Sequence, residues 1–345
     1  MRKIVTIAAI AAAGGALLAG CSSPGSPGSP GPGSAGGGAP VTVRLGYLAN
    51  ITHAPALIGV RNGYFTQALG NAGTLKTSVF TSGTQETTAI LSGQLDAAYV
   101  GPNPAINAWS KSGGTAIKVV SGAATGGASI VVKPSVTTAK QLKGTSIATP
   151  SLGNTQDVAA RYWLKRNGLT TSATGGGDVS VKPTAPNSAA VLEFKSGQIA
   201  GASEPSPYDV QMEQDGGKVL LSEPGVTTVL VVAQSFLSAH PDLVGDLLKA
   251  QIQASDYIGK NPAQAARIAN DQLAAYTGKP LKPAILTPAF KEITFTDDPD
   301  AASLAADASQ AASVGLLKPV DLNGLFDLGP LNKLLKAAGE PQVSG

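Results

Sequence analysis

Four short segments of this 345-residue chain carry hydroxyl, amide or imidazole side chains beside the expected starts of helices. They are residues 50–55, 81–86, 101–107 and 150–157, and each is depleted in Lys and Arg. At a helix N-terminus, backbone N–H groups and the helix dipole favour an anion. The pattern is therefore typical of a site that holds a small anion or polar molecule.

The same side chains also suit plain helix capping. Asn103 before Pro104 indicates an N-cap followed by proline at the first helical position, and Gly101 allows a tight turn before them. For any one of these side chains, capping without ligand contact is the simpler interpretation. Four such segments together favour a ligand site.

Strands alternate with helices through most of the folded part of the sequence, and this predicts α/β layers with mostly parallel sheets. In such sheets, ligands bind beyond the carboxyl ends of the strands, where the four segments lie. Strands are expected at 41–48, 77–81, 97–100, 116–121, 129–133, 146–149, 179–182, 199–203, 218–222 and 227–233. Helices are expected at 54–62, 84–91, 155–167, 188–196, 205–215, 241–259, 262–273 and 301–314, and from the 101–107 turn to about 111.

The alternation pauses at residues 134–143 and then resumes, which predicts two lobes. We expect 41–133 to form the first part of lobe 1, 134–222 to form lobe 2, and 223–345 to form the largely helical C-terminal part of lobe 1. The chain is expected to cross between the lobes near Lys133 and near Ser222.

Composition argues against nucleic-acid binding. Charged residues make up 14% of the chain, well below the usual proportion of about a quarter. No basic tract with interleaved aromatic residues appears, so a nucleic-acid surface is not expected.

Residues 1–20 have the features of an export signal. Arg2 and Lys3 precede an apolar run from Ile4 to Gly20, which is at the short limit for a membrane span. The string Leu-Ala-Gly-Cys at 18–21 resembles the lipobox of bacterial lipoproteins, which implies cleavage before Cys21 and lipid attachment to its sulfur. Cys21 is the only cysteine, so no intramolecular disulfide is possible.

The segment after Cys21 predicts a tether. Residues 22–40 contain only Ser, Pro, Gly and Ala, which cannot bury a core. Residues 21–40 are therefore expected to be a lipidated disordered tether. The folded part is expected to be extracytoplasmic and anchored to the cell membrane.

The sequence gives little support to catalysis. It has two histidines, His53 and His240, so a metal site or a Ser–His–acid triad has few candidates. No Gly-x-Ser-x-Gly or Walker-type string occurs. We expect no enzyme activity, no cofactor and no metal site.

Four strings resemble the solute-binding lipoproteins of ABC importers: Thr52–Ala56, Gly101–Asn107, Gly126–Ala128 and Ala148–Asp157. The subfamily is the one that takes up aliphatic sulfonates, taurine and nitrate, and it includes relatives that bind pyrimidine precursors of thiamine. The resemblance covers roughly residues 43–275. It implies a two-lobed α/β fold of the periplasmic-binding-protein type II class, with mixed sheets and a ligand cleft between the lobes.

The resemblance also implies a set of cleft residues. Those expected to line the cleft are Thr52, His53, Ser82, Gly83, Thr84, Gln85, Gly101, Pro102, Asn103, Ser151, Asn154, Thr155 and Gln156. Gly126 and Gly127 are expected near the hinge, and Asn187 and Glu204 are expected to approach from lobe 2. The Thr52–Pro55 segment differs from the best-known sulfonate and taurine binders, which leaves the ligand open.

The implied function is the capture of a small ligand, an aliphatic sulfonate, taurine or a nitrate-like anion, by lobe closure and its delivery to an ABC importer. The alternative is a secreted lipoprotein that binds or processes a pyrimidine or thiamine precursor, or another heterocycle. A third interpretation, a structural or adhesive surface protein, predicts no small ligand. The expected partners are the ligand, the permease subunits and, through Cys21, the membrane; we expect a monomer.

Overall fold

The computed structural model describes residues 39–344. The expected export signal, the Cys21 anchor and most of the tether lie outside the described residues. Within residues 39–344, no helix has both the length and the apolar character that crossing a membrane requires.

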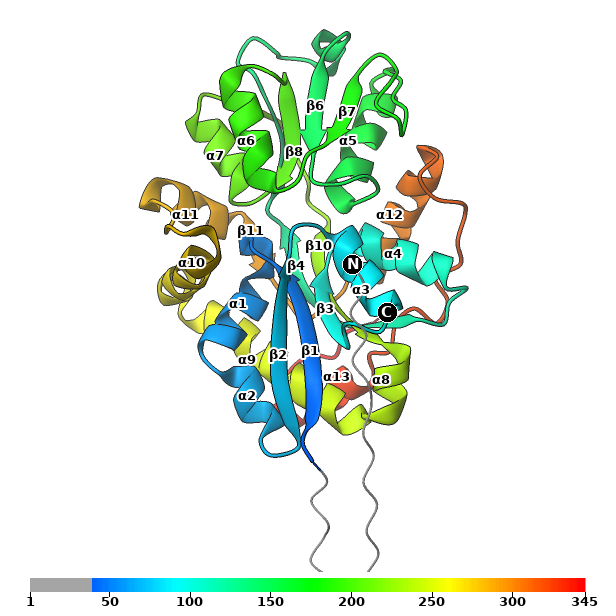
Figure 1. The fold of residues 1–345 in the computed structure, drawn as a ribbon, viewed down its shortest axis with the longest axis vertical. Helices are drawn as coiled ribbons and strands as arrows, with labels where there is room; N and C mark the ends of the chain where they lie inside the picture. Colours follow the sequence, from blue (N-terminus) through cyan, green and yellow to red (C-terminus); the bar gives the residue numbers. More distant parts are fainter. Residues whose placement is uncertain (1–38, 345) are drawn as a thin grey trace, which may run out of the picture. The chain divides into compact units, whose positions relative to one another are not determined.

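The first sheet has the strand order β11-β4-β10-β3-β1-β2 (Figure 1). Strand β1 runs parallel to β2 and β3, whereas β10 runs antiparallel to β3 and β4. Strand β10 is buried along its whole length, as its central place and its apolar run require. The strands are β1 (Val41–Leu48), β2 (Gly73–Phe80), β3 (Ala97–Val100), β4 (Ile117–Gly126), β10 (Val226–Ala233) and β11 (Ile293–Phe295).

The second sheet has the order β7-β6-β8-β5-β9. Strand β6 is parallel to β7 and β8, and β5 is antiparallel to β8 and β9. Each sheet therefore combines parallel strands with antiparallel ones, as the family resemblance implies. The prediction of mostly parallel sheets from the alternation of strands and helices is wrong, because β10, β5, β9 and β11 pair antiparallel with their neighbours. The strands are β5 (Ala128–Val132), β6 (Ser146–Thr149), β7 (Ser180–Pro183), β8 (Gly201–Pro205) and β9 (Lys218–Ser222).

The chain passes from the first sheet to the second at Gly127, between β4 and β5, and returns between β9 and β10. The first passage lies earlier than the crossing expected near Lys133, because β5 pairs with β8 and β9 of the second sheet. Gly126 and Gly127 have φ angles of 74° and 70°, which break an otherwise continuous β-rich run. Residues 128–133 thus belong to lobe 2, which corrects the expected boundary.

The helical segments of residues 39–344 divide between the two lobes. Those of lobe 1 are η1 (Ile51–His53), α1 (Ala54–Arg61), α2 (Tyr64–Leu69), α3 (Gly83–Leu91), α4 (Pro102–Lys111), α8 (Gln234–Ala239), α9 (Pro241–Lys260), α10 (Pro262–Thr277), α11 (Pro283–Lys291), α12 (Ala301–Ser313) and α13 (Gly329–Ala338). Those of lobe 2 are η2 (Ala139–Leu142), α5 (Thr155–Arg166), α6 (Asn187–Ser196) and α7 (Tyr208–Gln214). Helices α2, α8, α11 and α13 were not predicted from the sequence pattern, and α11 carries the internal Pro288.

The C-terminal helices return to lobe 1. Helix α9 packs against α1 and α2, and α10 packs against α1. A large apolar cluster fills lobe 1, and two smaller clusters lie in lobe 2. Helix α12 packs against both α4 of lobe 1 and α5 of lobe 2, and Figure 1 shows it beside them.

Candidate ligand-binding site

A small cavity lies between the lobes, where the parallel strands of both sheets end. Its volume, counted as the space open to the centre of a water molecule, is about 20 Å³. That is room for a water molecule or a very compact ligand. The lining residues are Leu48, Asn50, Thr52, His53, Thr81, Ser82, Gly83, Gly101, Pro104, Pro150, Asn154, Thr155, Gln156, Asn187, Pro205 and Thr227.

The structure brings many of the expected site residues to this cavity. From lobe 1 these are Thr52, His53, Ser82, Gly83 and Gly101, and from lobe 2 they are Asn154, Thr155, Gln156 and Asn187. Each follows the carboxyl end of a strand, which is the location that the α/β pattern predicts.

The other expected residues do not line the cavity: Thr84, Gln85, Pro102, Asn103, Gly126, Gly127, Ser151 and Glu204. Thr84 and Ser151 meet across the lobes, where Thr84 Oγ1 donates to Ser151 Oγ at 3.3 Å. Gln85 is exposed, and its Oε1 accepts from the Thr81 hydroxyl at 2.9 Å. Gly126 and Gly127 form the passage between the sheets.

Asn103 has a different role from the expected one. Gly101 is the N-cap of α4, and Pro102 rather than Pro104 occupies the first helical position. Two prolines in one turn offer two possible helix starts, and the local pattern of Asn103 and Pro104 favours the later one. Asn103 therefore lies inside the helix, where its Nδ2 donates to the Asp307 carbonyl of α12 at 3.2 Å. Its amide is directed at α12 rather than at the cavity.

Sequence reasoning missed several lining residues, among them Asn50 and Thr227. Asn50 is the N-cap of η1, and its Oδ1 accepts from the Thr52 hydroxyl at 2.8 Å. Its N-cap position was a usable signal. Thr227 lies where the chain returns from lobe 2, and its hydroxyl donates to the Gly126 carbonyl at 2.8 Å. No local pattern marks this long-range contact.

Several helices begin at the cavity. Residues at the starts of α3, α4, α5 and α6 line it, as does the η1 turn that leads into α1. The first N–H groups of each helix have no partner within the helix and carry a partial positive charge. Among the lining residues of the described chain there is no Lys, Arg, Asp or Glu.

His53 is an uncharged donor at this site. Its side chain is 1% exposed, and burial lowers the pKa of the imidazole to about 3. Nδ1 accepts a hydrogen bond from the Leu48 N–H at 3.2 Å, which assigns the proton of the neutral ring to Nε2. The Nε2–H group is thus left as a donor.

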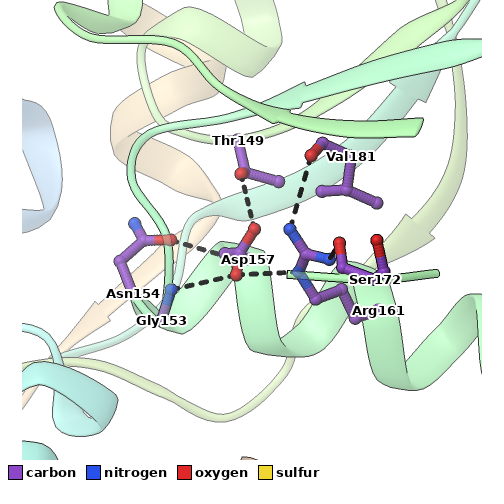
Figure 2. A network of polar contacts seen from close by, with 7 residues as sticks. All are labelled: Thr149, Gly153, Asn154, Asp157, Arg161, Ser172 and Val181. Carbon is purple, nitrogen blue, oxygen red and sulfur yellow. Dashed lines mark hydrogen bonds and ion pairs between the residues drawn. The ribbon is translucent and has the colours of Figure 1, made fainter. Parts of the chain in front are cut away.

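A buried polar network fixes the start of α5 (Figure 2). The Asp157 carboxylate accepts from the Gly153 N–H at 2.9 Å and from the Thr149 hydroxyl at 2.8 Å. Asn154 caps the helix, because its Oδ1 accepts from the Asp157 N–H at 2.8 Å. These bonds hold the loop that carries Asn154 and Thr155 to the cavity.

Arg161 completes this network and is one of the largest fully buried side chains among residues 39–344. Its Nε donates to Asp157 at 2.9 Å, and both residues are essentially unexposed. Nη1 and Nη2 donate to the carbonyls of Ser172 and Val181, at 2.6 Å and 3.4 Å. The guanidinium therefore ties α5 to β7 and to the loop before it (Figure 2).

Direct contacts close the two lobes over the cavity. The Ile51 N–H donates to the Ser206 carbonyl at 2.9 Å, and the Tyr208 hydroxyl donates to the Ala49 carbonyl at 3.2 Å. Helix α4 also packs against α5. The described conformation is therefore a closed one.

Gly101 of lobe 1 faces Thr155 of lobe 2 at the cavity. A Cβ atom at Gly101 would lie 2.6 Å from Thr155 Oγ1. Gly101 has φ of −65° and ψ of 151°, which any residue can adopt. The turn therefore does not require glycine at position 101, although a turn is the reason that the sequence suggests. The absence of a side chain instead leaves room for Thr155 of the other lobe. Thr155 Oγ1 is buried and has no hydrogen-bond partner.

Comparison with known proteins identifies the fold and the family. A family model described as the NMT1-like family matches residues 36–272, more than half of the chain. A search of the curated proteins found no match.

Solved structures of the same fold cover most of the chain. The alkanesulfonate-binding protein SsuA from Xanthomonas axonopodis pv. citri, bound to MOPS, is 18% identical with a TM-score of 0.71, over 85% of this chain and 100% of that one. The periplasmic nitrate-binding protein NrtA from Synechocystis PCC 6803 is 15% identical with a TM-score of 0.74, over 88% and 90%. A mutant of DSZB in complex with biphenyl-2-sulfinic acid is 16% identical with a TM-score of 0.62, over 86% and 99%.

These matches confirm the expected two-lobed α/β fold of periplasmic binding proteins. By the extent of the family match, this chain belongs to the NMT1-like family.

Proposed function

We propose that this chain is an extracytoplasmic solute-binding protein that captures one small oxyanion, of about the size of nitrate, between its lobes and delivers it to an ABC importer. One observation carries the proposal. Helix N-termini and hydrogen-bond donors converge on an interlobe cavity whose lining has neither a cation nor an acid.

The donors suit the oxygens of an anion. His53 offers its Nε2–H group, and Thr155 offers a hydroxyl that has no partner. The side-chain oxygens of Asn50 and Gln156 already accept hydrogen bonds, so the NH₂ groups of these two amides remain as donors. Backbone N–H groups at the helix starts add to these. Without Lys or Arg in the lining, an anion of low and delocalised charge is the easiest to desolvate.

The size of the cavity favours a compact ligand. A sphere with the cavity's volume of about 20 Å³ has a radius of about 1.7 Å. In a planar oxyanion, the distance from the central atom to each oxygen is close to the length of a C=O bond, about 1.23 Å. The atom centres of a planar oxyanion such as nitrate or bicarbonate fit within that radius. Taurine and longer sulfonates need a wider separation of the lobes than the described one.

The relatives support the same role. One solved structure of this fold is named a nitrate-binding protein and another an alkanesulfonate-binding protein. Both names describe proteins that bind oxyanions, and of the two ligands nitrate is the one compact enough for the described cavity. Delivery to a permease and the lipid anchor at Cys21 are also part of the proposal. Cys21 lies outside the described residues.

A thermal-shift panel tests the ligand class. Nitrate, bicarbonate, methanesulfonate, taurine and hydroxymethylpyrimidine are compared, with chloride at equal ionic strength as the control. We expect nitrate or bicarbonate to stabilise the protein by about 2.7 kcal/mol at a hundred times its Kd, which raises Tm by several degrees. A panel in which no anion exceeds chloride would contradict the proposal.

A neutral heterocycle is the second candidate, because the lining is uncharged and His53 is neutral. A six-membered ring exceeds the described cavity, so this ligand requires a less closed conformation. Stabilisation by hydroxymethylpyrimidine alone would favour it. Mass spectrometry of the ligand after incubation separates binding from processing, and we expect the ligand to be recovered unchanged.

A further inference from the structure

One buried acid stands directly behind the cavity lining. Glu204, at the end of β8, is fully buried, and its Oε2 accepts from Asn187 Nδ2 at 2.6 Å. Asn187 lines the cavity. Oε1 of Glu204 is also buried and has no hydrogen-bond partner. An unpartnered carboxylate oxygen in such a place is costly unless it is protonated or finds a donor.

The groups that face Glu204 offer it no positive charge. Asn187 of α6 contributes an amide, and α7 contributes the Tyr208 hydroxyl and the Asp209 carboxyl. Glu223, between β9 and β10, contributes another acid. In the sheet, Ser129 of β5 is paired with Glu204 itself. The charged groups that act on Glu204 within the described chain are thus Asp209 and Glu223, both acidic.

These surroundings favour the neutral form of Glu204. Burial raises the pKa of its carboxyl well above the usual value, the Asn187 hydrogen bond opposes this, and the charges of Asp209 and Glu223 add to it. Burial also raises the pKa of Asp209 to about 8 and that of Glu223 to about 7. Because Oε2 already accepts from Asn187, the proton of a neutral Glu204 belongs on Oε1.

We propose that Glu204 is the proton-binding residue of this site and that the anion binds together with one proton on Glu204 Oε1. The inference rests on the proposed function, since it requires an anionic ligand. An ionised Glu204 and a bound anion would be two buried negative charges with no cation between them. Protonation removes one of these charges and lets the anion bind.

The direction of the pH effect follows from linkage. A bound anion makes the charged form of Glu204 less favourable, so the pKa of Glu204 is higher in the complex than in the free protein. Binding therefore takes up a proton at any pH between these two values. Affinity is independent of pH below the free-state pKa and falls by up to tenfold per pH unit above it.

Titration calorimetry with nitrate tests this. Nitrate has no titratable proton in this range, so any proton uptake belongs to the protein. The titrations run from about pH 6 to about pH 10, in pairs of buffers with different ionisation enthalpies, which gives the number of protons taken up. We expect uptake that approaches one proton at the alkaline end and a matching fall in affinity.

Two variants assign the proton. Glu204→Gln keeps the size of the side chain and an oxygen for the Asn187 amide, and we expect it to abolish the uptake. Glu213→Gln is the matched control, because Glu213 is a half-buried acid of α7 that faces Glu292; uptake should persist. Unchanged uptake in Glu204→Gln would overturn the inference and assign the proton to a neighbouring buried acid, Asp209 or Glu223.

Asn187→Ala gives an independent check if Glu204→Gln folds poorly. The Asn187 hydrogen bond lowers the pKa of Glu204, so its loss should move the fall in affinity to higher pH. A shift to lower pH, or none, would contradict the inference. If nitrate binds without proton uptake, the inference alone fails, whereas absence of nitrate binding at every pH would contradict the proposed function as well.

Discussion

Replacing Gly101 with alanine is expected to weaken nitrate binding by about ten- to hundredfold and to leave both lobes folded. The new Cβ would lie 2.6 Å from Thr155 Oγ1 of the opposite lobe, so the closed state is overpacked. Overpacking costs about 1–3 kcal/mol, and each 1.4 kcal/mol is a tenfold change in affinity. The backbone at Gly101 accepts alanine without strain. Titration calorimetry with nitrate measures the effect.

Two further variants test whether the contact between lobes causes this loss. Gly245→Ala adds the same methyl group where no atom lies within 4 Å, and its affinity should equal that of the unmodified chain. In a Thr155→Ala background, the atoms nearest to the new Cβ at position 101 would lie 3.6 Å away. Gly101→Ala should therefore cost much less nitrate affinity in that background. An equal cost in both backgrounds would show that the interlobe contact is not the cause.

Replacing Arg161 with methionine is expected to lower the free energy of unfolding by about 3–5 kcal/mol, the usual cost of removing one partner of a buried ion pair. The change leaves the Asp157 carboxylate buried without its cation and removes the donors to Ser172 and Val181. Chemical denaturation measures it. Nitrate affinity should fall too, because Asp157 holds the loop before α5.

The matched control for this change is Arg166→Met on the same helix. Arg166 is exposed, so the change should stay within about 0.5 kcal/mol. A loss below about 1 kcal/mol in Arg161→Met would indicate that the network drawn in Figure 2 does not position the loop.

The sequence predicted the location of the site better than its details. The rule that ligands bind beyond parallel strands predicted that Thr52, Ser82 and Asn154 would gather, because strand ends and helix starts are local patterns, and these residues line one cavity. That they contact a ligand stays a prediction. Asn103 was assigned to the wrong place because two neighbouring prolines allow two helix starts. That choice depends on the packing of α4 against α12, which no local pattern records.

The remaining features depend on contacts between distant parts of the chain. The close approach of Gly101 and Thr155 exists only once both lobes are folded and closed. Arg161 looks like an ordinary surface residue in the sequence, yet it is buried and donates to the carbonyls of Ser172 and Val181. The first crossing between the lobes was predicted near Lys133, whereas it lies at Gly127. The run of β-forming residues continues on both sides of Gly127, so the sequence does not mark the crossing there.

Small-angle X-ray scattering of the chain with and without nitrate tests the central claim, the capture of an oxyanion by lobe closure, most directly. The proposal predicts that the radius of gyration falls on addition of saturating nitrate or bicarbonate, because the ligand favours the closed state. Chloride should not change it, and Gly101→Ala should need a higher nitrate concentration than the unmodified chain for the same decrease. A radius of gyration that does not change at saturation would contradict the claim.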